Sequence, residues 1–553
     1  MTFAAQTLFR LAALCSPSLL PLGMATDVKP LRPFRDPPAS PRLTPFLAPL
    51  PMPSPASSRG AFATNAQVPR GAGAPNYFEL IAEERDVRLH PELPLTRVWG
   101  YRDASVPTTS LMLGPTLVQR ADHPLIVRYR NELPRNHVGF GTTDTVVHYH
   151  GAHLPAAYDG FPENIPGYAA VIASGESYDQ CLPGMSPGAI DGNTDNSDRP
   201  ATMWYHDHAL DFTAQNVYRG LAGAFVFFDE VDTGDETTGL RLPSGAYDVP
   251  LVLQDRRLDA RGQLWYDPLD HNGFLGDLFL VNGAVQPFLE ARGRRYRFRL
   301  LNGCNARFLS MRLRTADGRP VPFDVIGTEG GLLARSMRDQ ASAFMSPAKR
   351  YDILVDFSRF TPGTVIFLEN NLDQPDGRGP RGSFENPRHK PVPDRFLKIV
   401  VGQPAQDESR SPDVLRPFSA IPAAELAAAP RRTLEFGRRK CVWTINDEAV
   451  DLERPLFTVN RGQGEVWTLR NSSGGWWHPI HTHLEFVRIL RRNGGPPTLF
   501  ERDGMARSDT VMLGPNDEVE VFVKFRDYPG RWVMHCHTLE HEDAFMMTCF
   551  DVR

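Results

Sequence analysis

A short segment near the end of the chain carries two kinds of sulfur ligand together with three imidazoles. It reads HCHTLEHEDAFMM and holds Cys536, His541 and Met546, with His535 and His537 on either side of the cysteine. Thiolate and thioether sulfur suit Cu(I), and imidazole suits Cu(II) as well, so this ligand set indicates copper. Side chains alternate faces along a strand, so Cys536 points one way and both flanking histidines point the other. One segment can therefore serve two metal sites.

Three further pairs of histidines have the same spacing, and each pair would present two imidazoles to one face of a strand. They occur in HYHG, HDH and HTH, at His148 and His150, His206 and His208, and His481 and His483. Together with His535 and His537 they make four pairs. That number suffices for a cluster of three metal ions that keeps positions open for a small ligand.

His478 stands outside these pairs. It precedes His481 by three residues, with Pro479 between them, so a turn there could aim it toward Cys536. Two histidines, one cysteine and a long axial methionine are the ligands of a blue-copper site. The sequence therefore predicts such a site beside the cluster.

In this order the four segments resemble the four copper motifs of the multicopper oxidases. The resemblance runs from about Phe78 to Arg553, and WYHDHAL, YRFRLLNGCNARF and HPIHTHLEF are most similar to spore-coat laccases and bilirubin oxidases of bacterial type. It implies four copper ions, one of type 1, one of type 2 and two of type 3. The implied ligands are His478, Cys536, His541 and Met546 for type 1, His148 and His481 for type 2, and His150, His206, His208, His483, His535 and His537 for type 3.

The resemblance also implies carboxylates that supply protons near the cluster. Asp159 in AAYDGFPE and Glu542 after His541 match acidic positions of the spore-coat laccases. The alternative for the pair is a solvated loop aspartate and a glutamate on a helix surface. Trp476 and Trp477 beside the third motif either form a wall of the donor pocket or simply pack in the core.

The composition indicates an all-β protein. Among 553 residues there are 50 prolines and 45 glycines, which fit many short strands joined by turns better than long helices. With the resemblance, this predicts three cupredoxin-like domains, each a Greek-key β-barrel or sandwich. We expect an N-terminal segment and proline-rich arm at 1–70, followed by domains at 71–230, 231–401 and 402–553, the second of which contains no histidine pair.

Charge and hydropathy limit which binding partners and which cellular compartment we expect. The net charge is −5 without a basic block, so nucleic acid is not an expected partner, and no run is long enough to predict a membrane span. Residues 1–25 partly resemble a signal peptide, which would place the protein in the periplasm or outside the cell. The weak charge, Pro17 and Pro21, and a possible start at Met24 favour the cytoplasm instead.

Two features stay open at this level. Cys181, Cys304, Cys441 and Cys549 either include a disulfide or are buried free thiols, because no spacing fixes a pairing. The long polar segment at 163–200 is either a flap beside the cluster or a mobile surface loop.

The expected function is a laccase-like oxidation of phenolic or other aromatic donors, with bilirubin-type pigments among them. Single electrons would enter at type 1 copper, and the three-copper cluster would reduce dioxygen to water without an organic cofactor. The alternative is a metallo-oxidase of Cu(I), Fe(II) or Mn(II), although residues 355–400 contain no methionine that could bind Cu(I). We expect a monomer with a small-molecule donor.

Overall fold

The computed structural model describes residues 37–553 except 166, 169, 440–441, 499 and 503–504. The possible signal peptide and Cys441 therefore lie outside the described residues. Strands dominate what is described, so the predicted all-β fold class is confirmed. The α-helices within it are short: α2 (Thr213–Arg219), α3 (Ala423–Ala428) and α4 (Leu539–Asp543). No helix in the described part of the chain is both long and apolar enough to cross a membrane.

The strands of residues 76–228 form two four-stranded sheets, ordered β2-β1-β4-β6 and β3-β8-β7-β5, which we call the first sheet pair. One core lies between them, with Leu80 and Phe225 among its members. The strands are β1 (Asn76–Val87), β2 (Thr96–Asp103), β3 (Leu117–Arg120), β4 (Leu125–Asn131), β5 (Val147–His150), β6 (Ser177–Leu182), β7 (Thr202–Asp207) and β8 (Ala222–Phe228).

Residues 248–404 form the second sheet pair, with one sheet ordered β11-β10-β9-β13-β19-β16-β17 and the other β12-β21-β20-β14-β15, where β18 also pairs with β14. Ile353 and Leu368 from the two sheets share one core. The strands are β9 (Asp248–Arg256), β10 (Leu278–Val281), β11 (Ala284–Val285), β12 (Phe288–Gly293), β13 (Arg295–Asn302), β14 (Leu309–Thr315), β15 (Pro320–Val321), β16 (Phe323–Thr328), β17 (Gly331–Gln340), β18 (Ala343–Met345), β19 (Arg350–Asp356), β20 (Val365–Leu372) and β21 (His389–Pro404).

Residues 431–552 form the third sheet pair, ordered β23-β22-β25-β29-β27 and β24-β31-β30-β26-β28. Alternating apolar residues, as in EVEVFVK of β29, fill the core between the two sheets. The strands are β22 (Arg431–Arg439), β23 (Val442–Ile445), β24 (Phe457–Val459), β25 (Gly464–Asn471), β26 (His478–Thr482), β27 (Arg488–Arg492), β28 (Thr510–Leu513), β29 (Glu518–Lys524), β30 (Gly530–Cys536) and β31 (Met547–Val552).

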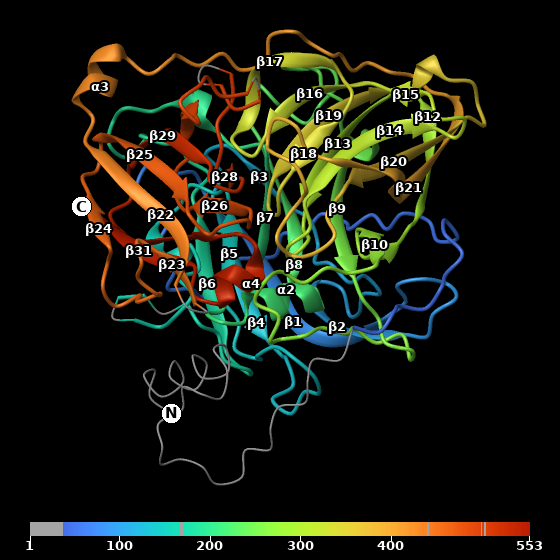
Figure 1. The fold of residues 1–553 in the computed structure, drawn as a ribbon, viewed down its shortest axis with the longest axis horizontal. Helices are drawn as coiled ribbons and strands as arrows, with labels where there is room; N and C mark the ends of the chain where they lie inside the picture. Colours follow the sequence, from blue (N-terminus) through green and yellow to red (C-terminus); the bar gives the residue numbers. More distant parts are fainter. Residues whose placement is uncertain (1–36, 166, 169, 440–441, 499, 503–504) are drawn as a thin grey trace.

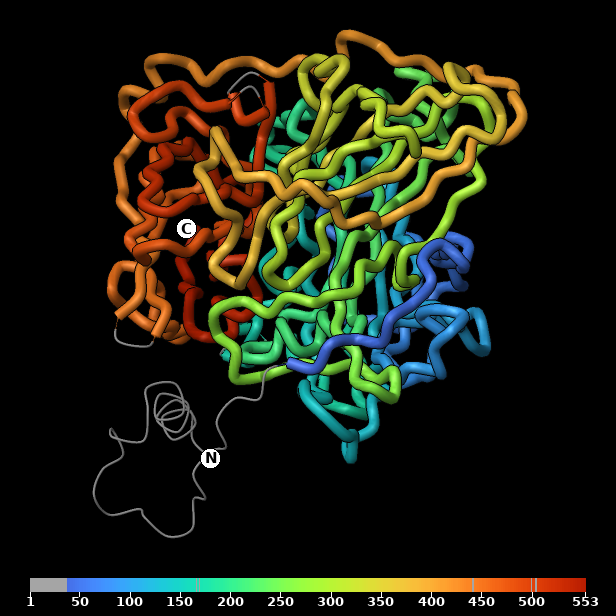
Figure 2. The backbone as a smooth tube through the Cα atoms, turned by 45° about the vertical axis from the view of Figure 1, so that its right-hand side comes forward, coloured from blue at the N-terminus to red at the C-terminus, as the bar shows by residue number. Residues whose placement is uncertain are grey.

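The three sheet pairs lie side by side in Figure 1, with the third in orange and red on the left, the first in blue and teal at the centre and below it, and the second in green and yellow toward the right. The extended segment that precedes them runs over the surface as the blue tube in Figure 2. Its backbone amides bond to the second pair through Leu50 N and Phe288 O (2.7 Å), and to the first through Ala56 N and Thr116 O (2.8 Å). The arm therefore joins two sheet pairs.

The polar segment at 163–200 reaches the third sheet pair. The Asp527 carboxylate accepts hydrogen bonds from the amides of Gly188 (2.5 Å) and Ile190 (2.8 Å). Asp198 at the other end of the segment is buried between Arg507 and Arg526. Burial alone would raise the pKa of Asp198, but the two arginines hold it well below its ordinary value. Charge pairing thus fixes the segment across two sheet pairs.

The cysteines outside the candidate sites are unpaired where the structure describes them. Cys181, Cys304 and Cys549 are buried free thiols. Burial raises the pKa of each of these thiols above its usual range. Of the two possibilities that the sequence left open, the described residues therefore show the free thiols.

Candidate metal centres

Strand pairing brings the four histidine pairs to one place between the first and third sheet pairs. In the antiparallel ladder of β5 and β7, His148 lies opposite His206, so both pairs point to the same side. In β26 and β30, His481 lies opposite His535 in the same way. Because strand side chains alternate with a period of two, one register in each ladder is enough to align all four pairs.

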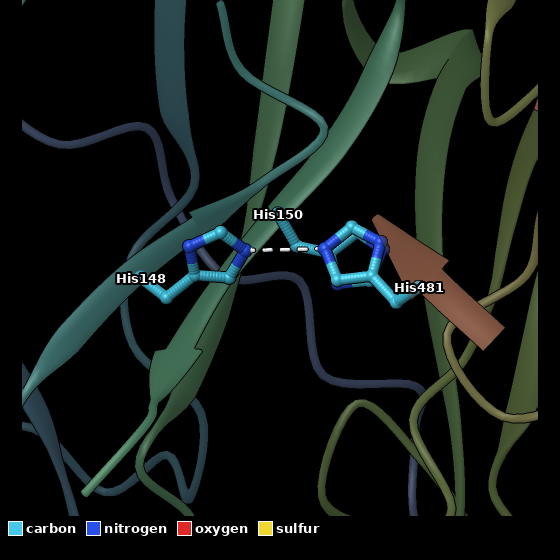
Figure 3. A group of neighbouring side chains, drawn as sticks. All are labelled: His148, His150 and His481. Atoms are coloured by element: carbon cyan, nitrogen blue, oxygen red, sulfur yellow. Dashed lines mark hydrogen bonds between the residues drawn. The ribbon is translucent and has the colours of Figure 1, made fainter. Parts of the chain in front are cut away.

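His148 and His481 face each other across this interface, with their Nε2 atoms 3.4 Å apart (Figure 3). The Nδ1 of His148 donates to the carbonyl oxygen of Asp159 (2.7 Å), and that of His481 donates to the carbonyl of Asp509 (2.8 Å). Since a carbonyl oxygen only accepts, each Nδ1 carries the proton and each Nε2 keeps a lone pair. The geometry leaves two imidazole lone pairs converging on one point.

The other six histidines form two groups whose ligand atoms lie within 4.8 Å of one another: His150, His206 and His537, and His208, His483 and His535. In the second group the Nε2 of His535 is 3.2 Å from the Nε2 atoms of both partners. In the first group His150 Nδ1, His206 Nε2 and both nitrogens of His537 are buried without a hydrogen-bond partner. Unsatisfied buried nitrogens are costly, and these atoms are free to ligate a metal.

Burial favours the neutral imidazole at six of the cluster histidines, and the neutral ring is the form that ligates a metal. It is the largest cause of the lowered pKa of the cluster histidines for which a shift is resolved, and the neighbouring histidines lower the pKa further. Those histidines are His150, His206, His208, His481, His483 and His537.

A third kind of group holds the cysteine. Cys536 Sγ lies 3.5 Å from His478 Nδ1 and 3.6 Å from His541 Nδ1, which are 3.1 Å apart. All three residues are buried, and burial lowers the pKa of His478 to about 3. The Ser473 hydroxyl bonds to His478 Nε2 (2.8 Å), which orients that ring. One cysteine sulfur beside two imidazoles is the His2Cys part of the blue-copper ligand set that the sequence predicts.

The methionine of the motif packs against this group. Met546 belongs to the core cluster that contains Cys536, and its backbone bonds to both Cys536 and His541. Met547 belongs instead to a separate cluster with Phe161 and Val533. The two sulfurs therefore lie in different cores, and Met546 shares the core of the cysteine.

We expect Met546→Leu to raise the reduction potential of the type 1 copper, because removing a weak thioether donor destabilises Cu(II) more than Cu(I). Met547→Leu is the matched control, because it removes the neighbouring sulfur, which lies in another core. The reduction potential of type 1 copper in this variant should equal that of the wild type. Redox titration followed through the blue absorption band measures both. If only Met547→Leu raised the potential, the axial ligand would be Met547 and the assignment of Met546 would be wrong.

Both predicted carboxylates are buried rather than solvated. Asp159 Oδ2 lies 2.5 Å from His483 Nδ1, and burial raises the pKa of Asp159 although the His148 side chain partly offsets this. Glu542 on α4 lies 3.0 Å from His535 Nδ1 and 3.6 Å from His208 Nε2, and neither of its oxygens has a hydrogen-bond partner. The structure thus places one carboxylate on either side of the histidine groups.

Two residues at these sites were not found from the sequence. Asp509 contacts His150 and His481, although it lies in no histidine motif. The ring of Trp443 covers His541 at a centroid distance of 4.1 Å and also contacts Trp476 (5.3 Å). Trp477 is buried against Phe308 and is part of the core. Nothing in the local spacing of Asp509 or Trp443 signals their position, because both reach the sites through tertiary packing.

Comparison with known proteins agrees with this geometry. Family models described as multicopper oxidase match residues 100–232 and 426–553. The chain is 31% identical to a laccase of Bacillus subtilis over 86% of this chain and 94% of that protein. It is 31% identical to a bilirubin oxidase of Albifimbria verrucaria over 93% of this chain and 82% of that one. The crystal structure of McoA multicopper oxidase from Aquifex aeolicus matches with a TM-score of 0.72 and 26% identity, covering 91% and 99%.

The buried histidine groups, the buried cysteine beside two imidazoles and the family matches together identify a copper-dependent oxidoreductase that uses oxygen. The chain belongs to the multicopper oxidase family. It is a laccase-like member that takes four copper ions, of types 1, 2 and 3, and uses dioxygen as its electron acceptor. The predictions of family, activity and cofactor are confirmed, while the ligand of each ion remains a prediction.

Proposed function

We propose the ligand assignment that combines the sequence motifs with the observed groups. The type 1 ligands are His478, Cys536, His541 and Met546, the type 2 ligands are His148 and His481, and the type 3 ligands are the groups His150, His206 and His537 and His208, His483 and His535. Converging lone pairs and buried nitrogens without partners support it. Copper held by these residues would supply one-electron oxidation of a donor and the four-electron, four-proton reduction of dioxygen to two waters. Cys536 is joined by one peptide bond to a histidine on each side, which gives the shortest covalent path between the sites.

We propose that the donor is an aromatic compound, and one observation carries this proposal. Trp443 covers His541, and the partly exposed Trp476 lies against Trp443. The Arg378 guanidinium lies 4.6 Å from the ring centre of Trp476, and that of Arg438 lies 4.6 Å from the ring centre of Trp443. Indole rings with adjacent positive charges suit phenols that bear a carboxylate, and bilirubin-type pigments.

Turnover at saturating copper with a neutral phenol, a phenolic carboxylate, bilirubin, Fe(II) and Cu(I) tests the donor class. Arg378→Ala should raise the KM for the two carboxylate-bearing donors roughly two- to five-fold, as expected for an exposed ion pair, and leave that of the neutral phenol unchanged. Arg439→Ala is the control, because Arg439 is an exposed arginine of β22 paired with Asp447. If the KM changed equally for all aromatic donors, Arg378 would not recognise the carboxylate of the donor.

The alternative donor is a metal ion, and a cavity of about 250 Å³ beside α4 favours it. Carboxylates line this cavity at Asp211, Asp270, Glu540 and Asp543, and Glu540 immediately precedes His541. Such a cavity would attract Cu(I), Fe(II) or Mn(II) rather than a neutral phenol. A kcat/KM for Fe(II) or Cu(I) above that of every aromatic donor would establish a metallo-oxidase.

We propose that Asp159 and Glu542 supply protons to the cluster, which their burial beside His483 and His535 supports. We also propose that the protein acts as a monomer, because each ligand group is complete within one chain.

The domain limits proposed are 71–230, 231–401 and 402–553. The ranges of the sheet pairs support them, and β21 extends to Pro404 beyond the second limit.

A further inference from the structure

The histidine groups differ in which ring nitrogen they present. His148, His206, His481 and His535 each use Nδ1 in a hydrogen bond to a backbone carbonyl, so Nε2 is left for a metal. His150 is reversed. Its Nε2 lies 3.1 Å from Asp509 Oδ1, and its Nδ1 is buried without a partner beside His206 and His537.

An ion pair sits behind the reversed ring. Arg350 on β19 donates to both carboxylate oxygens of Asp509, through Nη1 (2.9 Å) and Nη2 (2.6 Å). The side chains of Arg350 and Asp509 are 0% and 3% exposed. Both oxygens of Asp509 accept from the guanidinium in this two-pronged pair, so His150 Nε2 is the donor to Oδ1 and carries the ring proton. The lone pair of the neutral ring is then on Nδ1.

The rest of the Arg350 side chain is fully bonded. Its Nε donates to the carbonyl of Thr202 on β7 (3.1 Å), Nη1 to that of Ala348 (3.1 Å) and Nη2 to that of Glu329 (3.2 Å). A guanidinium has five donors, and these bonds with the two to Asp509 use all of them. Arg350 therefore connects a strand of the first sheet pair, its own second pair and Asp509 of the third.

The glycine after His150 leaves room for this pair. Gly151 has φ of +90°, and a Cβ at this position would lie 2.5 Å from Arg350 Nη2 and 3.0 Å from Asp509 Oδ2. Any larger residue would displace the guanidinium from the carboxylate. The glycine of the HYHG motif thus lets the ion pair approach the backbone beside a ligand.

We propose that Arg350 and Asp509 are positioning residues that hold His150 in the ring orientation and protonation state that present Nδ1 to the type 3 site. This inference rests on the proposed ligand role of His150. It gives the second sheet pair, which has no histidine pair, a part in the copper cluster: its arginine fixes a ligand of the first pair through a carboxylate of the third.

Asp509→Asn and Arg350→Lys test the proposal. Asparagine cannot accept from both arginine nitrogens and His150 as a carboxylate does, and lysine keeps the charge but loses the two-pronged geometry. We expect each variant to bind type 3 copper about 10- to 100-fold more weakly in competition with a chelator, the effect typical of losing a group that orients a ligand. Electron paramagnetic resonance should then detect uncoupled type 3 copper, while the blue band of type 1 copper persists and reports an intact third sheet pair.

Asp198→Asn is the matched control. It removes another buried carboxylate that pairs with arginines across the first and third sheet pairs but contacts no histidine of the cluster. Its resonance spectrum and chelator titration should match the wild type. If Asp509→Asn and Arg350→Lys also match the wild type while His150→Ala loses type 3 copper, the positioning role is overturned and the ligand role stands. If His150→Ala retains the cluster as well, the ligand assignment itself is wrong.

Discussion

Cys536→Ser should abolish the blue colour and reduce donor oxidation to background while the other copper ions remain bound. Cys536 is the sulfur between His478 and His541, and the bond of its thiolate to Cu(II) is the source of the intense absorption. The eight histidines of the cluster lie in groups that do not include this sulfur. Serine is similar in size and preserves the strand, so the loss should be confined to type 1 copper.

Cys549→Ser is the control for this variant. Cys549 is also a buried free thiol, on the adjacent strand β31, but its Sγ contacts the carbonyl of Leu452 rather than an imidazole. It should retain the colour and full turnover. Copper analysis, visible absorption and oxygen uptake measure the three properties. A fully loaded wild type with one copper per chain, or a blue Cys536→Ser, would overturn the architecture.

The histidine clusters could be predicted because the period of a strand is encoded locally. The spacing His-x-His places both imidazoles of a pair on one face of a strand. The antiparallel registers of His148 with His206 and of His481 with His535 then bring two pairs together in each ladder. Met546 is assigned instead from the motif spacing after His541 that the resemblance implies. In the structure it shares the core of Cys536, whereas Met547, the first residue of β31, lies in another core. The type of each side chain and its spacing therefore carried most of the site.

What the sequence could not predict depends on residues far apart in the chain. The nitrogen that His150 presents is set by Asp509 and Arg350, and the latter two are 159 positions apart. Asp159 ends the short helical turn Ala156–Tyr158, and its side chain is buried in contact with His483. Its local sequence is equally compatible with a solvated loop. Burial and hydrogen bonding across sheet pairs leave no periodic signal in the sequence.

The 163–200 segment illustrates the same limit. Its Gly, Pro, Asp and Asn content predicts a loop but not what the loop binds. In the structure Asp527, more than 300 residues away, accepts from the amides of Gly188 and Ile190, and it also bonds to His153 Nε2 (2.8 Å). His153 follows the first histidine motif, so the segment is fixed close to the cluster by a residue of the third sheet pair.

Glu542→Gln should slow the oxygen-reducing half of the reaction by roughly 10²-fold or more, the contribution typical of a positioned proton donor. The reaction consumes four protons for each dioxygen, and an amide cannot release one. Glu542 is buried on α4, 3.0 Å from His535 Nδ1, without a hydrogen-bond partner that would hold its carboxyl group away from this task. Copper content, the blue band and anaerobic reduction of type 1 copper by a donor should all be unchanged.

Glu465→Gln is the matched control for this last variant. Glu465 is likewise a buried glutamate of the third sheet pair, but it accepts from Trp467 Nε1 (2.7 Å) and pairs with Arg432, away from the histidine groups. Rapid mixing of the fully reduced enzyme with oxygen separates reoxidation from reduction, so a loss of stability cannot imitate the expected result. Reoxidation of Glu542→Gln at the wild-type rate across the pH range would show that the protons reach the cluster by another route, and Asp159 beside His483 is then the carboxylate left to supply them.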